Sequence, residues 1–563
     1  MPWRMIAIPD DWENHQQAAD VGRPADTWAA GWPAAIFLAV GMWLCMTAAA
    51  LLLRPLLPVD ETRYLAVAWE MWSGGHWLVP RLNGELYGHK PPLLFWLFHL
   101  GWAGFGVNEV WPRAVGPLAG LTCLLLTRAL GRALWPAQPG IGDAAMLVLC
   151  SFVAWPILGG TVMFDTLLTA GVLTALLGTA WVAAGRALAG WSLFAGGLVL
   201  GFFAKGPAVL PFLACIPLFG PLWAGAAGKG GVRVWWRWWS SAALAGIAAV
   251  AGIALWVVPA VLTEGVGYAF DVVRDQAAGR MTDSADHGRA WWWYAIALPP
   301  ALLPAIAWTT PWLRRKRPCD SGERFCLIWA GGALLLLSLV SGKQIHYLLP
   351  ALPAVALLMA RHLADIAATP TQARRRIAGP VLFCCLAGIA IAALPWLPLD
   401  RETLADVAPL ATGWGWVLAG IGLLALLPAT SLQRQVAVLA SLATTIVLIV
   451  HLAAAPLLAA RFDVRPLGER LGLWEREGRP LAHYGTYHGQ FHFFGRLQRP
   501  IVEIGDADAA AWMASHPNGI VVTYQEAEPL GGMALFAAAY RGGWAMVWDV
   551  GTASADPALI RRR

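Results

Sequence analysis

The sequence predicts a polytopic α-helical membrane protein that ends in a small α/β domain, and three observations support this fold class. Hydrophobic residues make up 58% of the 563 residues and charged residues only 13%, roughly half the charged share of an ordinary soluble domain. The chain contains 34 tryptophans, and tryptophan is enriched where helices meet membrane interfaces. Long apolar stretches recur up to about residue 460, after which polar and apolar residues alternate as in a soluble domain.

Each apolar stretch of about 20 residues is expected to form a membrane-spanning helix. The shorter stretch 91–107 begins with a pair of prolines, and we expect it to lie along the outer interface of the membrane. Only with that placement do the basic clusters between the spans fall on one side, as the positive-inside rule requires. About 13 spans result, at residues 32–53, 112–134, 143–159, 162–184, 188–204, 206–223, 240–262, 292–313, 325–341, 345–362, 376–396, 412–428 and 434–458.

This topology predicts three segments along the chain. Residues 1–31 form a cytoplasmic segment without the pattern of a cleavable signal peptide. Residues 32–460 form the membrane domain, with long external loops at 54–111 and 263–291. Residues 461–563 form an external α/β domain, in which "GIVVTYQE" predicts a buried strand and "DADAAAWMASH" a helix.

Several classes of function are disfavoured by composition and motifs. The net charge of +6 is spread over loops, which indicates topology and contact with anionic lipid, so no nucleic-acid partner is expected. The phosphate-binding patterns GxxxxGK[ST] and strand-linked GxGxxG are missing, so no nucleotide cradle is predicted. None of the eight cysteines shows CxxC spacing, which argues against a disulfide framework or a zinc knuckle.

Carboxylates are scarce, and a few stand where spans leave the membrane. "VDETRY" follows the first span, and a helix there would place Asp60, Arg63 and Tyr64 on one face, with Glu61 pointing elsewhere. Asp165 lies in "GTVMFDTLLTAG", at an external junction between two apolar runs. Both acids could simply begin helices. Because ionisable residues at membrane depth are costly, a functional role is the alternative.

Cations gather at the predicted outer ends of the same helices. Each of them alone is explained as an anchor that reaches to the headgroup region. Together they suit a lipid-linked phosphate, since charge-assisted hydrogen bonds to phosphate are strong. The cations are Lys90 in "YGHKPPLLFW", Lys205 in "FFAKGPAVLP", Arg274 and Arg280 in the second external loop, and Lys343 in "SGKQIHYLLP", which also contains Tyr347.

The stretch "DETRYLAVAWEMWSGGHWLVPRLNGELYGHKPPLLFWL" resembles the first external loop of the bacterial 4-amino-4-deoxy-L-arabinose lipid A transferases. These are GT-C glycosyltransferases, related to the protein O-mannosyltransferases. The blocks "MFDTLLT", "FFAKGPAVLP", "HGRAWWWY" and "SGKQIHYLLP" resemble further family blocks in the same order. The similarity extends from about Trp32 to Arg361, and the remainder agrees in layout more than in motif.

The resemblance implies a GT-C membrane domain of about 13 helices and a periplasmic α/β domain in the bacterial inner membrane. It implies an inverting transfer of a sugar from an undecaprenyl-phosphate carrier to lipid A or another envelope glycolipid, at the periplasmic face. Two alternatives stay open. One is a glycosyltransferase that acts on protein or polysaccharide; the other is a transporter or flippase for lipid-linked sugars, although no matched halves are visible.

The resemblance also implies roles for individual residues. Asp60 matches the catalytic-loop aspartate and Asp165 the second family aspartate, with Glu61 beside them as a further catalytic candidate. His89 stands where the family commonly has Glu, before Lys-Pro-Pro, so a divalent metal ion with His89 as a ligand is considered and no other cofactor is expected. The candidates for binding the carrier phosphate are Arg63, Tyr87, Lys90, Arg280, Lys343 and Tyr347. The tail histidines His483, His488 and His492 are interpreted as one face and turn of the first strands of the tail.

Overall fold

The computed structural model describes residues 31–224, 232–265, 267, 288–308, 318–365, 370–396, 413–425, 431–526 and 534–561. The chain divides into two compact units. The helical unit comprises residues 1–50, 89–91 and 116–453, and the α/β unit comprises residues 51–88, 92–115 and 454–563. Most of the loop predicted at 54–111 therefore belongs to the same unit as the C-terminal segment.

The helical unit confirms a multi-pass membrane protein. Among the described residues, nine helices are long and apolar enough to cross a membrane, with Ala187–Leu218 counted as one. The count of about 13 spans stays a prediction. The main α-helices of these spans are α3 (Ala34–Leu53), α6 (Val110–Leu134), α9 (Asp165–Ala183), α10 (Ala187–Lys205), α14 (Val232–Glu264), α19 (Ser321–Leu339), α20 (Leu352–Ala364), α21 (Pro370–Ala393) and α24 (Leu432–Phe462), and the span of α20 begins at Ile345.

Shorter elements complete the helical unit. The stretch predicted as a span at 143–159 is divided between α7 and α8, and the one at 292–313 has its only described α-helix in α17. The shorter elements are α7 (Gly140–Cys150), α8 (Ala154–Gly159), η2 (Gly206–Val209), α11 (Leu210–Leu213), α12 (Cys215–Leu218), α13 (Gly220–Trp223), α17 (Trp293–Ala301), η4 (Ala305–Ala307), η5 (Ile345–Ala351), η6 (Leu394–Trp396) and α23 (Trp414–Leu424).

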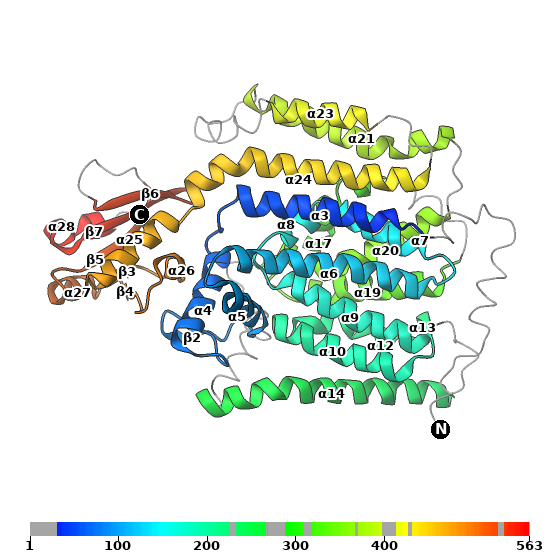
Figure 1. Ribbon diagram of the computed structural model, residues 1–563, viewed down its shortest axis with the longest axis horizontal. Helices are drawn as coiled ribbons and strands as arrows, with labels where there is room; N and C mark the ends of the chain where they lie inside the picture. Colours follow the sequence, from blue (N-terminus) through cyan, green and yellow to red (C-terminus); the bar gives the residue numbers. More distant parts are fainter. Residues whose placement is uncertain are drawn as a thin grey trace. The chain divides into compact units, whose positions relative to one another are not determined.

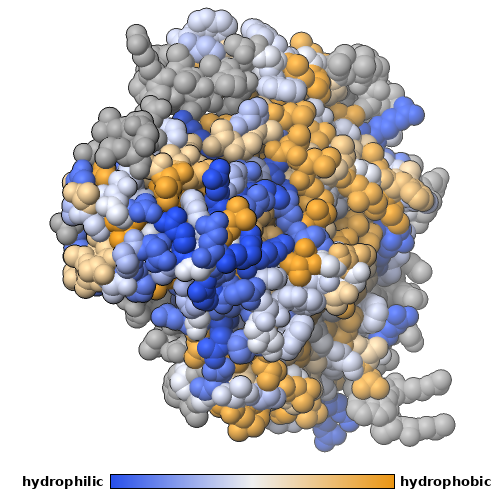
Figure 2. Space-filling view, turned by 60° about the vertical axis from the view of Figure 1, so that its left-hand side comes forward, coloured by the Kyte–Doolittle hydropathy of each residue, from blue (hydrophilic) through white to orange (hydrophobic). Residues whose placement is uncertain are grey.

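Apolar side chains on the outside of the helical unit indicate contact with lipid. The long helices α3, α6, α9, α10 and α14 follow a common direction (Figure 1). On α14, Leu244, Leu255 and Leu262 are 66%, 80% and 81% exposed, which would be unfavourable in water. Figure 2 shows broad hydrophobic areas on the surface. In a membrane these apolar side chains would contact lipid tails instead of water.

Helices α9 and α10 pack with their backbones in close contact. A Cβ atom added at Gly197 would lie 2.4 Å from the backbone nitrogen of Ala175, and one added at Gly178 would lie 2.5 Å from the carbonyl oxygen of Gly190. Glycines at such contacts let two membrane helices approach closely without a hydrophobic driving force. The antiparallel pairing brings the beginning of α9 to the end of α10.

The α/β unit is built on a five-stranded sheet with strand order β4-β3-β5-β7-β6. Strands β4, β3 and β5 are parallel, whereas β7 and β6 are antiparallel to their neighbours. The strand predicted from "GIVVTYQE" is β5, and the helix predicted from "DADAAAWMASH" is α27. The strands are β3 (Leu481–Tyr484), β4 (Val502–Ile504), β5 (Ile520–Gln525), β6 (Phe536–Tyr540) and β7 (Gly543–Asp549).

Helices cover both faces of this sheet and close two apolar cores. On one face, Leu467 and Leu471 of α25 pack with Phe491 and Val522. On the other face, Trp512 of α27 packs with Val521 and Ile560. The result is a three-layer α/β domain. The covering helices are α25 (Arg465–Arg476), α26 (His492–Gly495), α27 (Ala509–Ser515), α28 (Val550–Ala555) and α29 (Ala558–Arg561).

The segments 51–88 and 92–115 add two helices and a hairpin to the α/β unit. Helix α4 spans Asp60–Gly74, and α5, at Leu93–Phe105, has 13 residues, too few to cross a bilayer. The hairpin of β1 (Arg81–Leu82) and β2 (Glu85–Leu86) turns at Asn83 and Gly84, both with positive φ. The Asn83 side chain exchanges hydrogen bonds of 2.8 and 2.9 Å with the backbone of Ile501.

Candidate active site

The first group of site residues lies in the helical unit, where the carboxylate of Asp165 pairs with Lys205. Asp165 begins α9 and Lys205 ends α10, and the Lys205 Nζ lies 2.6 Å from the Asp165 Oδ1. Each side chain is 4% exposed. Gly206 ends α10 with a φ of +60°, a backbone conformation that glycine adopts readily. The close packing of α9 on α10 therefore creates a buried ion pair at one end of both helices.

Aromatic and cationic side chains surround this ion pair. The Lys205 Nζ lies 4.6 Å from the centre of the Tyr347 ring, and the Lys90 Nζ lies 5.8 Å from the ring of Phe164. Lys90 and His346 both lie within electrostatic reach of the Asp165 carboxylate. One carboxylate and two lysines leave the cluster with a net positive charge. Such a cluster suits a phosphate anion in a medium of low dielectric constant.

Lys343 occupies a different position in the same unit. Its Nζ donates to the carbonyl oxygen of Arg289 at 3.1 Å and to that of Val340. The residue is 2% exposed, and a bridge between Gly288 and Gly342 joins the same two segments. Lys343 therefore holds the C-terminal end of the second external loop, and its role as a phosphate ligand stays a prediction.

The second group of site residues lies at the beginning of α4, in the α/β unit. Arg63 forms an ion pair with Asp60 and lies over the ring of Tyr64, so the predicted shared face is present. The side chains of Asp60 and Arg63 are 52% and 26% exposed. Burial raises the pKa of Tyr87 to about 12, so its hydroxyl stays protonated and can donate a hydrogen bond at neutral pH. Asp60 is thus an accessible carboxylate beside an arginine and a tyrosine.

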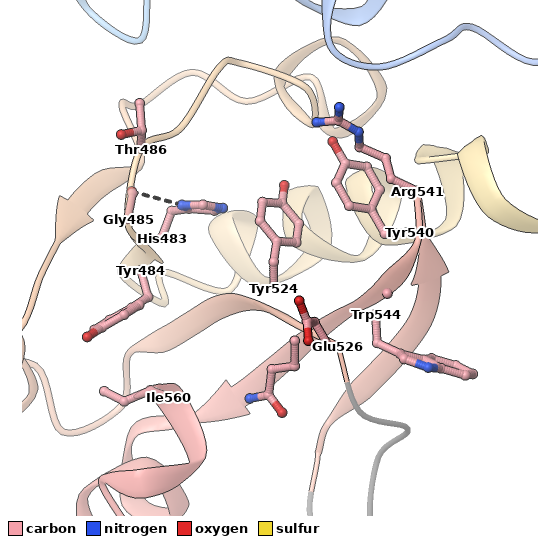
Figure 3. A pocket seen from close by; sticks show the side chains of 12 residues that line it. His483, Tyr484, Gly485, Thr486, Tyr524, Glu526, Tyr540, Arg541, Trp544 and Ile560 are labelled. Carbon is pink, nitrogen blue, oxygen red and sulfur yellow. Dashed lines mark hydrogen bonds between the residues drawn. The ribbon is translucent and has the colours of Figure 1, made fainter. Parts of the chain in front are cut away.

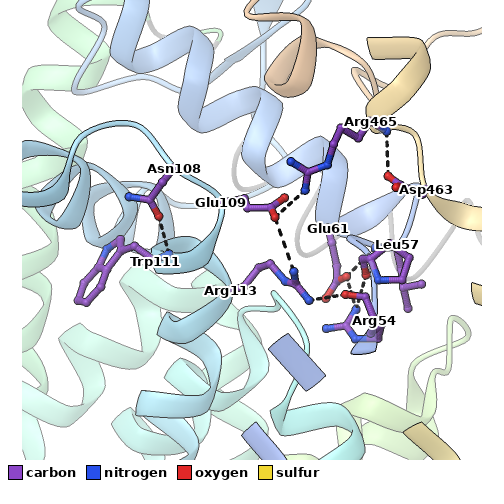
Figure 4. Close-up of polar contacts among 10 residues, drawn as sticks. Arg54, Leu57, Glu61, Asn108, Glu109, Trp111, Arg113, Asp463 and Arg465 are labelled. Atoms are coloured by element: carbon purple, nitrogen blue, oxygen red, sulfur yellow. Dashed lines mark hydrogen bonds and ion pairs between the residues drawn. The ribbon is translucent and has the colours of Figure 1, made fainter. Parts of the chain in front are cut away.

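Glu61 points away from Asp60, as expected, into a buried polar network (Figure 4). Its Oε2 pairs with Arg54 and accepts the backbone N–H of Leu57 at 2.7 Å. Arg113 donates to the carbonyl oxygen of Arg54. The side chain of Glu61 is 4% exposed. This geometry fixes the turn that precedes α4, and a catalytic role for Glu61 stays a prediction.

The same network reaches the C-terminal segment of the α/β unit. Glu109 lies 3.9 Å from Arg113 and accepts a hydrogen bond of 2.6 Å from Arg465. Arg465 opens α25. The turn that precedes Asp60 is therefore tied to the first helix of the C-terminal domain, a connection that sequence analysis did not predict.

Two further predicted site residues are Arg280 and His89. Arg280, like Arg274, lies outside the described residues. His89 is exposed, and among the described residues no group of three or more His, Cys, Asp or Glu side chains could hold a metal ion. The described residues therefore do not fit a metal site around His89, and its role as a ligand stays a prediction.

Lys205 was predicted from the sequence as a cation at a helix end, without its partner. The signal was a lysine at a helix end before Gly-Pro in "FFAKGPAVLP". Its pairing with Asp165 depends on the packing of α9 and α10, which joins residues 40 positions apart. His346 was not singled out, although it stands directly before Tyr347 in a block that was. Helix α9 has no side-chain cap hydrogen bond among the described residues, so Asp165 does not act as its cap.

Comparisons with known proteins agree with this architecture. No family model matches the sequence. The chain is 29% identical over 413 residues to undecaprenyl phosphate-alpha-4-amino-4-deoxy-L-arabinose arabinosyl transferase 1 of Pseudomonas fluorescens, covering 66% of this chain and 69% of that protein. It is 31% identical over 354 residues to the transferase of Pseudomonas paraeruginosa, covering 61% and 62%. The chain thus spans less than two thirds of the length of several curated relatives that it matches.

Solved structures match over a larger share of the chain. ArnT from Cupriavidus metallidurans, in a crystal structure bound to undecaprenyl phosphate, has a TM-score of 0.70 at 17% identity, covering 91% of this chain and 97% of that one. The apo state of the same protein gives a TM-score of 0.74 at 16% identity, with the same coverage. At these identities the likeness shows the fold.

A multi-pass helical membrane domain with a small C-terminal sheet domain defines a membrane protein of the GT-C fold. The relatives matched in sequence are all named as arabinosyl transferases. In sequence the chain is similar to the undecaprenyl phosphate-aminoarabinose arabinosyl transferases, and in fold it is similar to ArnT.

Proposed function

We propose that this protein is an inverting glycosyltransferase that takes its sugar from an undecaprenyl-phosphate carrier. The acceptor is lipid A or another envelope glycolipid, and the sugar is of the aminoarabinose type. The relatives are named for a transfer of this kind, and the related ArnT structure contains undecaprenyl phosphate. The active site faces the periplasm from the bacterial inner membrane, a placement supported by the positions of the basic clusters along the sequence.

The observation that carries the proposal is the positive cluster around Asp165. Lys205 and Lys90 lie close to the aromatic rings of Tyr347 and Phe164, in a unit whose outside is apolar. A phosphate attached to a polyprenyl chain combines the same two properties, a headgroup anion and an apolar tail. The lysines would therefore attract the phosphate of the carrier, and the apolar surface would bury its polyprenyl tail.

In the reaction, the acceptor oxygen attacks the anomeric carbon while the bond to the carrier phosphate breaks. Negative charge grows on the departing phosphate, and Lys90 and Lys205 stabilise it without reorganising at the moment of reaction. Positive charge grows on the sugar ring, as in other glycosyl transfers, and a nearby carboxylate stabilises it. The pairing of Asp165 with Lys205 keeps that carboxylate ionised in its buried position.

The acceptor decides the role of Asp60. If a hydroxyl attacks, Asp60 takes its proton as a general base, for which an accessible carboxylate is required. If a phosphate of lipid A attacks, the acceptor is already an anion near neutral pH, since its second pKa is about 6. Asp60 and Arg63 then orient the acceptor or the amino group of the sugar.

The proposal is tested with purified Asp60→Asn and Lys90→Ala variants in an assay of sugar transfer from the polyprenyl carrier to lipid A. We expect each variant to lose at least about 100-fold in rate, as is usual when a positioned group for charge stabilisation is removed. Glu85→Gln, an exposed carboxylate in the same unit as Asp60, is the matched control and should retain the rate. Wild-type rates in both variants would overturn the assignment, and transfer to protein or polysaccharide alone would replace the acceptor.

A further inference from the structure

A pocket of about 490 Å³ opens at one edge of the five-stranded sheet, within the size range of small-ligand sites. Tyr484 and Gly485 line it from the end of β3, and Gln525 and Glu526 line it from the end of β5. Gly543, at the beginning of the antiparallel strand β7, completes this edge. In open α/β sheets, ligands bind outside the carboxyl ends of the parallel strands, so the pocket occupies the usual place for a ligand.

His483 directs an unsatisfied acceptor into this pocket. Its imidazole is 1% exposed and points toward Tyr524 (Figure 3). The Nδ1 atom lies 3.0 Å from the carbonyl oxygen of Gly485 and donates to it, whereas Nε2 is buried with no partner among the described residues. Because burial lowers the pKa of His483 to about 4, the ring is neutral and Nε2 is an acceptor. A ligand with an O–H or N–H group would satisfy it.

The other walls combine flat aromatic rings with charged groups. The rings of Tyr524 and Tyr540 stack at 4.6 Å with an angle of 12° between their planes, and Gln490 donates to the Tyr524 hydroxyl. Glu526 and Arg541 are exposed at the rim (Figure 3). Hydroxyl and amino groups find donors and acceptors on such walls, and the C–H faces of a sugar ring can pack on the tyrosines. The lining therefore fits a saccharide better than an acyl chain.

The pocket belongs to the same unit as Asp60, which begins α4. His488, four residues beyond Tyr484, is affected electrostatically by Arg63 and Asp60 on α4 and by Arg541 at the pocket rim. A saccharide held in the pocket would therefore stand near the accessible carboxylate that acts on or orients the acceptor.

We propose that this pocket binds a saccharide of the acceptor glycolipid and so sets the acceptor preference of the enzyme. The proposal rests on the proposed function for the identity of the acceptor. The sugar of the donor stays with the carrier phosphate at the cluster around Asp165, and the pocket takes a second sugar that is not transferred.

Two variants remove charge from the rim without disturbing the fold. Glu526→Gln keeps the size of an exposed side chain. Arg541 has a φ of +61°, a conformation that Asn tolerates well, and glycine follows it, so Arg541→Asn preserves the turn between β6 and β7. The matched control is Arg476→Gln, an exposed cation of α25 outside the pocket lining.

The experiment measures steady-state transfer by the full-length protein in lipid nanodiscs, with lipid A as the acceptor. We expect the KM for lipid A to rise about tenfold in each rim variant, the usual effect of losing a hydrogen bond to a charged group. The KM for the donor and kcat should stay unchanged, and Arg476→Gln should match the wild type. An unchanged KM for lipid A, or a rise in the KM for the donor instead, would overturn the proposal.

Binding is measured separately with lipid A freed of its acyl chains, by saturation-transfer NMR on the same nanodiscs. We expect saturation of the sugar protons in the wild type and its loss in Glu526→Gln and Arg541→Asn. Equal signals in all proteins would contradict the proposed saccharide site. A wild type that transfers nothing to lipid A but binds the saccharide at this pocket would overturn only the proposed function, so the two failures can be told apart.

Discussion

At the scale of single residues, the ion pair of Asp165 and Lys205 governs the interior of the helical unit. Both side chains are 4% exposed, so each charge depends on the other for its stability. Removing one partner of a buried pair leaves an uncompensated charge, whereas replacing both by apolar groups is often tolerated. The pair therefore couples the stability of the helices to the electrostatics of the candidate active site.

Lys205→Met is expected to destabilise the protein by about 3–5 kcal/mol, because it leaves the Asp165 carboxylate buried without its cation. Asp165→Leu should cost a similar amount for the converse reason. The double variant should recover most of this loss, while transfer activity stays absent. Thermal unfolding in detergent measures the three stabilities, and a double variant as unstable as the sum of the single variants would contradict the coupling.

Local relations between residues were predictable from the sequence, and distant ones were not. The face shared by Asp60, Arg63 and Tyr64 follows from helical spacing, and the structure contains it. The network of Glu61 with Arg54 and its neighbours joins segments hundreds of residues apart, because Glu109 meets Arg465 across 356 positions. Such contacts depend on tertiary packing, which periodicity does not encode.

At the scale of elements, the packing of α9 on α10 is what brings Asp165 to Lys205. The contact is made by backbone, since a Cβ at Gly197 would meet the carbonyl oxygen of Gly171 at 2.6 Å as well as the nitrogen of Ala175. Gly196 stands next to it, and a Cβ there meets no atom of the described chain within 4 Å. Substitution of either glycine by alanine changes helix propensity alike, but only at Gly197 does the added methyl group disturb the packing of α9 on α10.

Gly197→Ala should therefore destabilise the protein by about 1–3 kcal/mol, because the added methyl group forces the two backbones apart. Gly196→Ala, which adds the same group to the same helix, should change stability by less than about 0.5 kcal/mol. Thermal unfolding of the two variants side by side decides the matter. Equal effects at both positions would mean that the helices do not pack through this glycine contact.

Whether a segment forms a helix or a strand was predicted better than the bounds of the membrane spans. The apolar stretch 91–107 contains the 13-residue helix α5, and its placement along the outer interface stays a prediction. By contrast, His483 lies on β3, but His492 opens α26 and His488 lies between them, so the tail histidines do not share one strand face. Short helices such as α26 bury few residues and leave little periodic signal.

At the scale of the whole molecule, the sequence predicted a membrane part and a C-terminal α/β part, but not the composition of the second unit. Residues 51–88 and 92–115 belong to it, including α4 with Asp60 and the hairpin at Asn83. The resemblance suggested only that this loop carries catalytic residues. Because α4 and the C-terminal sheet belong to one unit, loss of stability in the sheet is expected to destabilise the segment that carries Asp60.

Among its described residues, the α/β unit contains three buried histidines, His99, His483 and His492, and these make its stability depend on pH. Burial lowers the pKa of His483 and of His492 to about 4, below the usual 6.5, and it also lowers the pKa of His99. The buried rings are neutral in the folded unit, whereas the unfolded chain takes up their protons. Stability is therefore complete above about pH 6.5 and falls as the pH drops toward 4, by about 1.4 kcal/mol per pH unit for each of His483 and His492.

Hydrogen exchange of the β5 amides, corrected for the intrinsic rate at each pH, measures this loss as the free energy of opening of the unit. His492→Gln should reduce the slope between pH 6 and 4.5 by about 1.4 kcal/mol per pH unit, because one of the buried groups no longer titrates. His76→Gln, which alters an exposed histidine of the same unit, should leave the slope as it is in the wild type. A slope that is unchanged in His492→Gln would show that protonation of His492 does not oppose folding, and that the acid sensitivity of the unit has another origin.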